Sequence, residues 1–156
     1  MKNKTVCFTG HREIRDDSLK ERLEALLIEL IEDGYEEFLA GGARGFDMMA
    51  ADVVLALKKT YPHIKLILYL PFFNQYRAES GWSEEEKADY HVQKLLADEA
   101  LHVAKEYRRG IYYERNRLLV DNASLCVAYL YKSTGGTAYT VDYAKRRNMK
   151  IINIAI

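Results

Sequence analysis

Residues 5–12 read Thr5-Val6-Cys7-Phe8-Thr9-Gly10-His11-Arg12. The first five are β-branched, aromatic or cysteine residues, which is typical of a strand buried on both faces of a sheet. Gly10 ends this run, and polar residues follow it directly. A buried strand that ends in glycine and is followed by a helical pattern is the opening unit of an α/β fold.

The rest of the chain continues this alternation. Apolar spacing predicts a helix from residue 19 to a stop at Gly34, and further helices over 46–59, 84–96, 111–121 and from the turn at 133–137 to residue 147. Further strands are expected at 36–40, 64–70, 100–104, 125–131 and 151–154. Two capping boxes are predicted at helix starts: Ser18 with Glu21, and Ser83 with Glu86.

This order of elements predicts an α/β fold: a Rossmann-like three-layer sandwich with a mostly parallel central sheet and helices on both faces. No repeat or flexible linker divides the chain, so residues 1–156 are expected to form one domain.

Composition narrows the function. Lys plus Arg and Asp plus Glu both number 23, so no overall positive charge favours nucleic acid. Cys7 and Cys126 lie in apolar runs and are expected to be reduced core thiols, which fits a cytoplasmic location. The first residues do not resemble a signal peptide, and no apolar run approaches the roughly 20 residues of a membrane span.

Three predicted strand ends carry unusual residues. They are Thr9-Gly10-His11-Arg12, Gly41-Gly42-Ala43-Arg44-Gly45-Phe46-Asp47 and Ser133-Thr134-Gly135-Gly136-Thr137. Glycine lets the backbone approach a ligand closely, and the amides that open the following helix attract anions. The arginines and Thr137 could add further hydrogen bonds to a phosphate. Each turn alone is also compatible with a simple tight turn, and Asp47 with a favourable charge in the first turn of a helix.

Two other segments could contribute to a site. In the loop over 72–82, Phe72, Tyr76 and Trp82 could stack on a base while Gln75 reaches its polar edge. The alternative is that these rings cover the edge of the sheet. Arg115, in the predicted helix over 111–121, could reach a phosphate or be solvated at the surface.

Several catalytic motifs are absent from the sequence. There is no GxxxxGK[ST] loop, no GxGxxG fingerprint, no GxSxG elbow and no HExxH. The four histidines show no spacing typical of metal ligands, so no metal site is expected.

Taken in order, these motifs resemble the SLOG superfamily of Rossmannoid proteins, which includes the Smf/DprA-like and Lonely Guy-like proteins. The YpsA-like branch of bacterial proteins is the most similar, and the resemblance covers essentially the whole chain. It implies a nucleotide-related ligand, with ADP-ribose or NAD as leading candidates and no other cofactor. The candidate ligand-binding residues are Gly10, His11, Arg12, Gly41, Gly42, Arg44, Gly45, Asp47, Phe72, Gln75, Trp82, Arg115, Asn116, Ser133, Gly135, Gly136 and Thr137.

The resemblance also bears on catalysis. Lonely Guy enzymes carry a PGGxGTxxE motif, and this chain has Thr140 where the catalytic glutamate stands. Threonine cannot replace a carboxylate base, so we expect a sensor-type binding protein without catalytic residues. Two alternatives stay open: an N-glycosidic hydrolase that uses Asp47, Glu79 or Glu114, and a single-stranded DNA-binding protein of the Smf/DprA type. The expected partner is a small-molecule nucleotide; a homo-oligomer is also open, nucleic acid is disfavoured and no membrane is expected.

Overall fold

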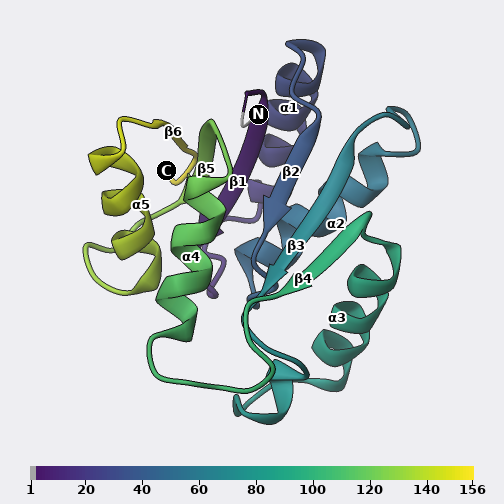
Figure 1. Cartoon of the computed structure of the whole chain (residues 1–156). Helices are drawn as coiled ribbons and strands as arrows, with labels where there is room; N and C mark the ends of the chain where they lie inside the picture. Colours follow the sequence, from purple (N-terminus) through teal and green to yellow (C-terminus); the bar gives the residue numbers. More distant parts are fainter. Residues whose placement is uncertain (1–2) are drawn as a thin grey trace.

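The computed structural model describes residues 3–156 and forms one six-stranded sheet in which all strands are parallel (Figure 1). The strands are β1 (Thr5–Gly10), β2 (Glu37–Ala40), β3 (Lys65–Leu70), β4 (Glu99–His102), β5 (Leu125–Tyr129) and β6 (Lys150–Asn153). The helices are α1 (Leu19–Glu32), α2 (Phe46–Leu57), α3 (Glu84–Leu96), α4 (Ile111–Asp121) and α5 (Gly136–Arg146), with a short 3-10 turn η1 (Gln75–Arg77).

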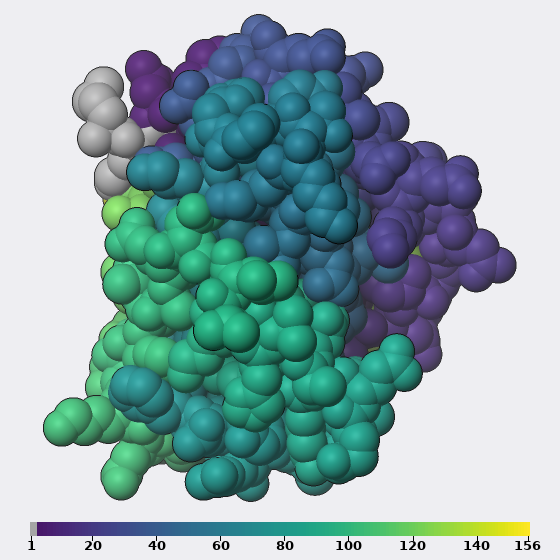
Figure 2. Space-filling view, turned by 90° about the vertical axis from the view of Figure 1, so that its right-hand side faces the viewer, coloured from purple at the N-terminus to yellow at the C-terminus, as the bar shows by residue number. Residues whose placement is uncertain are grey.

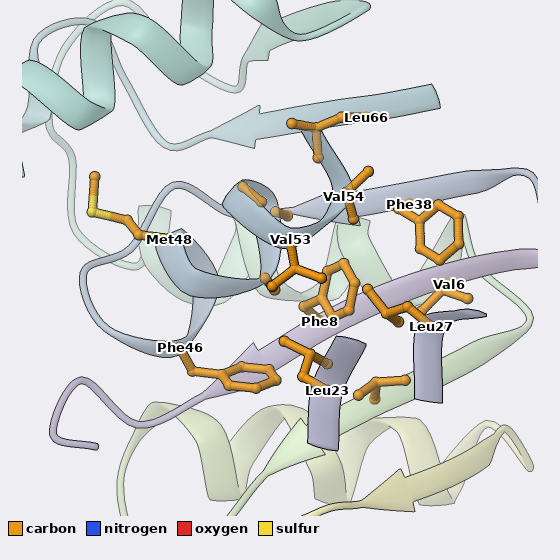
Figure 3. Close-up of a cluster of buried hydrophobic side chains, with 14 of the residues drawn as sticks. Val6, Phe8, Leu23, Leu27, Phe38, Phe46, Met48, Val53, Val54 and Leu66 are labelled. Carbon is orange, nitrogen blue, oxygen red and sulfur yellow. The ribbon is translucent and has the colours of Figure 1, made fainter. Parts of the chain in front are cut away.

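The helices form two layers around the sheet. Successive residues of β1 point to opposite faces: Val6 and Phe8 pack with α1 and α2, whereas Cys7 packs with α4 and α5. Figure 3 shows the first of these cores, with Phe8 and Phe38 between the sheet and the two helices. A strand buried on both faces cannot alternate polar and apolar residues, which explains the continuous apolar run in β1.

The two edges of the sheet are the short strands β4 and β6. Figure 2 views the molecule from the β4 side, where α3 and β4 (teal to green) fill much of the lower part of the face. The predicted short strand at 100–104 is confirmed as β4. It starts one residue earlier than predicted and ends two residues earlier.

The predicted three-layer α/β fold is confirmed, and the sheet is entirely parallel rather than mostly parallel. The predicted strand over 125–131 ends earlier, at Tyr129. Tyr129 is the last residue of β5 in register with β1, and the amide of Leu130 instead donates to Asn153 Oδ1 at 3.0 Å. The stop at Gly34 is confirmed, because its φ of +101° suits glycine at the end of α1.

One of the two predicted capping boxes is wrong. Ser83 has an extended backbone, its Oγ accepts from Glu86 N at 3.0 Å, and the reciprocal bond to Glu86 is present. Ser18 instead has helical φ and ψ, and its side chain makes no hydrogen bond to the helix amides. Its Oγ donates to Asp16 Oδ1 at 2.7 Å, and Asp16 also accepts from the Ser18 amide.

Cys7 and Cys126 are free and buried, as the sequence predicts, and they lie side by side on β1 and β5. A hydrogen bond between the two thiols, together with burial, raises the pKa of Cys7. Both thiols are therefore packing groups in this core. No helix within residues 3–156 is long and apolar enough to cross a bilayer.

Candidate functional site

The order of the strands reverses between β1 and β5. From β1 the chain builds outward through β2, β3 and β4, then returns to the other side of β1 with β5 and β6. Ligands of open parallel sheets bind at such switch points, outside the carboxyl ends of the strands. The three glycine-rich turns follow β1, β2 and β5, which are neighbours in the sheet. The turns therefore converge at the carboxyl ends of these strands, which lie at the lower end of the sheet in Figure 1, and the convergence is a consequence of the topology.

A cavity of about 300 Å³ lies where these turns meet. Its lining residues come from all three turns and from α4: Thr9, Gly10, His11, Arg12, Ala43, Asp47, Tyr112, Arg115, Asn116, Gly136 and Thr137. Eight of these are among the candidate ligand-binding residues named from the sequence, that is, all except Thr9, Ala43 and Tyr112. The volume is at the lower end of the range for small-molecule pockets.

Two glycines allow the first two turns to touch. A Cβ on Gly10 would lie 2.4 Å from the ring of Phe46, and one on Gly45 would lie 2.3 Å from the backbone oxygen of Arg12. Gly45 also has a φ of +86°, which disfavours any other residue. The amide of Phe46 donates to His11 O at 3.2 Å. The start of α2 is thereby fixed against the end of β1.

Arg115 is the buried cation of the cavity, with 5% of its surface exposed. Its Nη1 donates to Gly41 O, and its Nε donates to Asn116 Oδ1 at 2.8 Å. Within residues 3–156 no hydrogen-bond partner is found for Nη2. Burial lowers the pKa of Arg115 and the Asp47 carboxylate opposes this effect, but an arginine keeps its charge in proteins. The guanidinium therefore has a free donor beside the cavity.

Asp47 lies in the first turn of α2 and is 6% exposed. Its Oδ2 accepts from Gly41 N at 3.2 Å. Burial raises the pKa of Asp47 to about 6, against the opposing effects of Arg115 and of the Ala43 and Gly41 amides. This carboxyl group therefore changes its charge near neutral pH, at the wall of the cavity.

His11 closes the β1 side of the cavity. Its ring centroid lies 4.3 Å from that of Tyr131, and its buried Nε2 has no partner within residues 3–156. Burial, with smaller effects of Lys132 and Arg15, lowers the pKa of His11, so the imidazole is neutral at pH 7. On the opposite side, the Cβ position of Gly136 meets only Asn116 Nδ2, at 3.9 Å. The N-terminal turn of α5 is therefore open to the cavity.

A smaller cavity of about 190 Å³ adjoins the first. The two share Gly10, Arg12, Ala43, Tyr112 and Arg115, and the smaller one adds Arg44, Gln75 and Glu79. Glu79 accepts from the Trp82 indole at 2.9 Å and from the Tyr112 hydroxyl at 2.7 Å. The carboxylate is therefore held in one orientation.

Other predicted residues lie outside both cavities. Gly41 and Gly42 lie beneath them, against Arg115 and Leu70 respectively, and Gly45 lies behind Arg12. Ser133 and Gly135 line a separate open groove of about 560 Å³ with Lys132. Gly135 has a φ of +99° and is the N-cap residue before α5, so it shapes the turn without lining either cavity.

The aromatic residues of the 72–82 loop are packed inside the protein. Phe72 is 2% exposed between the rings of Tyr107 and Tyr112, and Trp82 is 7% exposed against Tyr76 and Tyr90. Neither ring lines either of the two cavities, so in this arrangement neither reaches a base bound there. Both rings pack against other aromatic side chains of the protein.

Tyr112 is the residue that the sequence analysis missed. It lines both cavities, and its ring centroid lies 5.8 Å from the Arg115 guanidinium carbon. Residues three apart on a helix share a face, so the position of Arg115 was a signal for Tyr112. Glu79, considered in the sequence only as a catalytic alternative, is its hydrogen-bond partner.

A wider groove of about 570 Å³ runs along Arg15, Ser18 and Tyr131, but it contains none of the glycine turns. No cluster of three or more potential metal ligands occurs within residues 3–156. The pair of cavities at the switch point is therefore the candidate ligand site.

The fold and this site define a Rossmann-like α/β protein with a pocket built from glycine-rich strand-to-helix turns. Residues 2–155 match the model of the YpsA family, described as the YspA SLOG family, and the chain belongs to that family. The resemblance that the sequence motifs indicated is thereby confirmed.

Relatives in sequence include UPF0398 protein BH1768 of Halalkalibacterium halodurans, 35% identical over 85% of this chain and 70% of the relative. The SPbeta prophage-derived protein YoqJ of Bacillus subtilis is 33% identical over 82% of this chain and 81% of its own length.

In structure, the chain is similar to DNA processing protein A of Helicobacter pylori, described with a single-stranded DNA binding mode, and of Streptococcus pneumoniae. Both comparisons have a TM-score of 0.69 and cover 94% of this chain, at 18% and 16% identity. The chain spans only 63% and 48% of those two proteins. At these identities the likeness establishes the shared fold.

Proposed function

We propose that this protein binds a nucleotide derivative and places its phosphate in the 300 Å³ cavity, with ADP-ribose or NAD as leading candidates. The observation that supports this most directly is the convergence of three turns and the buried Arg115 on one small space. The N-terminal turn of α5, through Gly136 and Thr137, contributes unpaired amides and partial positive charge there. An anion is the ligand that such a set of donors favours.

Arg12 supplies the second cationic side chain. It is exposed, lines both cavities and has no side-chain partner within residues 3–156. An unpaired arginine at the mouth can turn towards an incoming phosphate without losing an existing ion pair. Arg115 would then hold the phosphate from below and Arg12 from above.

Isothermal titration with pyrophosphate, AMP, ADP-ribose and NAD tests this proposal. Arg12→Ala should weaken binding about 10- to 100-fold, because a hydrogen bond to a charged group contributes about 1.5–3 kcal/mol. Arg109→Ala is the matched control, since Arg109 is exposed and lines neither cavity. Absence of heat with all four compounds at millimolar concentration would exclude the proposed function.

A binding role without catalysis fits the position of Thr140. This side chain is 1% exposed, and its hydroxyl donates to Gly136 O at 2.8 Å instead of facing the cavity. The position of the Lonely Guy glutamate therefore offers a ligand neither a carboxylate nor a free hydroxyl.

The hydrolase alternative is supported by one observation, the Asp47 carboxyl with a pKa of about 6 at the cavity wall. A group with this pKa can serve as a general acid or base near pH 7. Release of free base from AMP or NAD during overnight incubation, lost in Asp47→Asn, would favour this alternative. Intact nucleotides would favour the sensor.

The single-stranded DNA alternative is supported by the shared fold alone. A DNA groove needs several arginines on one face, but Arg115 and Arg117 are two residues apart on α4 and point to different faces. Arg115 is buried, and Arg117 donates to the Tyr139 hydroxyl at 2.9 Å. Salt-dependent binding of oligonucleotides, in competition with ADP-ribose, is the test of this alternative.

A further inference from the structure

Gln75 has an unusual environment. It is 1% exposed and is held by the short turn η1, where the preceding Asn74 has a left-handed backbone with φ of +52°. Its Nε2 donates to Gly42 O at 3.2 Å, which fixes the orientation of the amide. Its Oε1 is buried and has no hydrogen-bond partner within residues 3–156. A buried acceptor without a hydrogen bond is costly in free energy, so a partner from outside the chain would stabilise it.

The smaller cavity is the space that Gln75 lines. The Glu79 carboxylate also lines it, one turn further along the chain, and its two oxygens each accept one bond, from Trp82 and from Tyr112. Each carboxylate oxygen can accept a second bond. The smaller cavity therefore adds two acceptors, Gln75 Oε1 and the Glu79 carboxylate, to the cations Arg12 and Arg115 that both cavities share.

Acceptors next to these shared cations match a ligand that carries an anion and, beside it, hydrogen-bond donors. We infer that the smaller cavity binds a donor group of the ligand, a sugar hydroxyl or a base amino group, through Gln75 Oε1 and Glu79. The inference rests on the proposed function, because it places the anion of the same molecule in the larger cavity. At about 190 Å³ the space suits one part of a nucleotide and not a whole one.

A series of ligands, titrated into the unmodified protein, shows whether the donor is a sugar hydroxyl or the base amino group. Titrations with AMP, 2′-deoxy-AMP, 3′-deoxy-AMP and IMP remove one hydroxyl or the amino group at a time, and pyrophosphate serves as the probe for the anion alone. Loss of the matched donor should weaken binding by about tenfold or more, because buried acceptors are then left unpaired.

Gln75→Met tests the residue itself. It removes the acceptor at similar size, so AMP should bind as weakly as the analogue that lacks the matched donor, while the affinity for pyrophosphate stays unchanged. Gln93→Met is the matched control, because Gln93 is another buried glutamine whose amide donates to a backbone oxygen, that of Met48 at 3.0 Å, and it lines neither cavity. Gln93→Met should keep the preference for AMP over that analogue.

The outcomes separate the two proposals. If pyrophosphate and all nucleotides bind with affinities within twofold of one another, the inference is wrong and the anion site stands. The same holds if Gln75→Met keeps the discrimination of the unmodified protein. If neither pyrophosphate nor any nucleotide binds, the proposed function fails and this inference fails with it.

Discussion

Asp47 and Arg115 hold the two polar groups of one residue, Gly41. The Asp47 carboxylate accepts from the Gly41 amide, and the Arg115 guanidinium donates to the Gly41 carbonyl. One side chain comes from α2 and the other from α4, which lie on opposite faces of the sheet. The end of β2 is thus the point at which the two helical layers meet through polar contacts, at the floor of the cavity.

This packing leaves no room for a side chain at residue 41. A Cβ there would lie 2.9 Å from Asp47 Oδ2 and 3.0 Å from Arg115 Cδ. Gly41→Ala should therefore lower the free energy of unfolding by about 1–3 kcal/mol, as overpacking does. Gly136→Ala is the control, since its Cβ meets nothing closer than 3.9 Å, and it should raise stability by about 0.4–1 kcal/mol. Denaturant unfolding of both variants measures the difference, and equal stabilities would contradict the packing described.

The raised pKa of Asp47 predicts a variant that is more stable than the natural chain at high pH. The folded pKa of about 6 exceeds the ordinary 3.8, so the folded state binds the proton more tightly and its ionisation opposes folding. This penalty, about 3 kcal/mol, is complete above the folded pKa and disappears as the pH falls towards the ordinary value.

Asp47→Asn removes the charge while keeping an acceptor for Gly41. Its stability should exceed that of the unmodified protein at pH 8 by up to about 3 kcal/mol, and the difference should vanish near pH 4. Urea unfolding at several pH values measures this. If Asp47→Asn were less stable than the unmodified protein at pH 8, the attraction between Asp47 and Arg115 would outweigh the cost of burying the carboxylate.

The same carboxyl group predicts a pH-dependent affinity for anions. Sulfate is the suitable probe, because its charge does not change between pH 5 and 8. Protonation of Asp47 removes a negative charge from the cavity wall, so sulfate should bind more tightly as the pH falls through about 6. Arginine side chains stay charged in this range, and the His11 imidazole at the same cavity adds to the increase as the pH falls below its own, lowered pKa.

Two variants separate these contributions. Asp47→Asn should bind sulfate at pH 8 as well as the unmodified protein does near pH 5.5. Asp89→Asn is the control, because Asp89 also has a pKa of about 6, raised by burial and by Asp52, but it lines a groove between α2 and α3. An Asp89→Asn variant that changed sulfate binding as strongly as Asp47→Asn would place the pH effect outside the cavity.

Much of this fold was predictable because buried parallel strands and amphipathic helices leave strong patterns. The run Val6-Cys7-Phe8 and the spacing of Leu19, Leu23 and Leu27 are such patterns, and both predictions are confirmed. The convergence of the turns after β1 and β2 was predictable, because the carboxyl ends of parallel strands lie at the same end of the sheet. The position of β5 beside β1 did not, because strand order depends on packing between distant segments.

Irregular segments were the least predictable. The 72–82 loop has no period that would indicate which rings face inward, and the structure buries Phe72 and Trp82 while leaving Phe73 exposed and stacked on His102 at 3.7 Å. Ser18 likewise fits the capping pattern in sequence, but Asp16 competes for its hydroxyl. In the loop, contacts between side chains distant in sequence decided the outcome, whereas at Ser18 the competing acceptor is the nearby Asp16.

Gly136 offers the sharpest test of where the ligand lies. Its φ is not in the left-handed region and its Cβ position is open, so Gly136→Val adds bulk to the cavity at little cost from strain. A valine there would occupy space beside Asn116 that the proposed phosphate needs, and binding of AMP and pyrophosphate should fall at least about tenfold. Ala138→Val is the control, because Ala138 is on the same turn of α5 but lines the groove on its other side. Circular dichroism should show both variants folded, and a folded Gly136→Val with unchanged affinity would remove the start of α5 from the site.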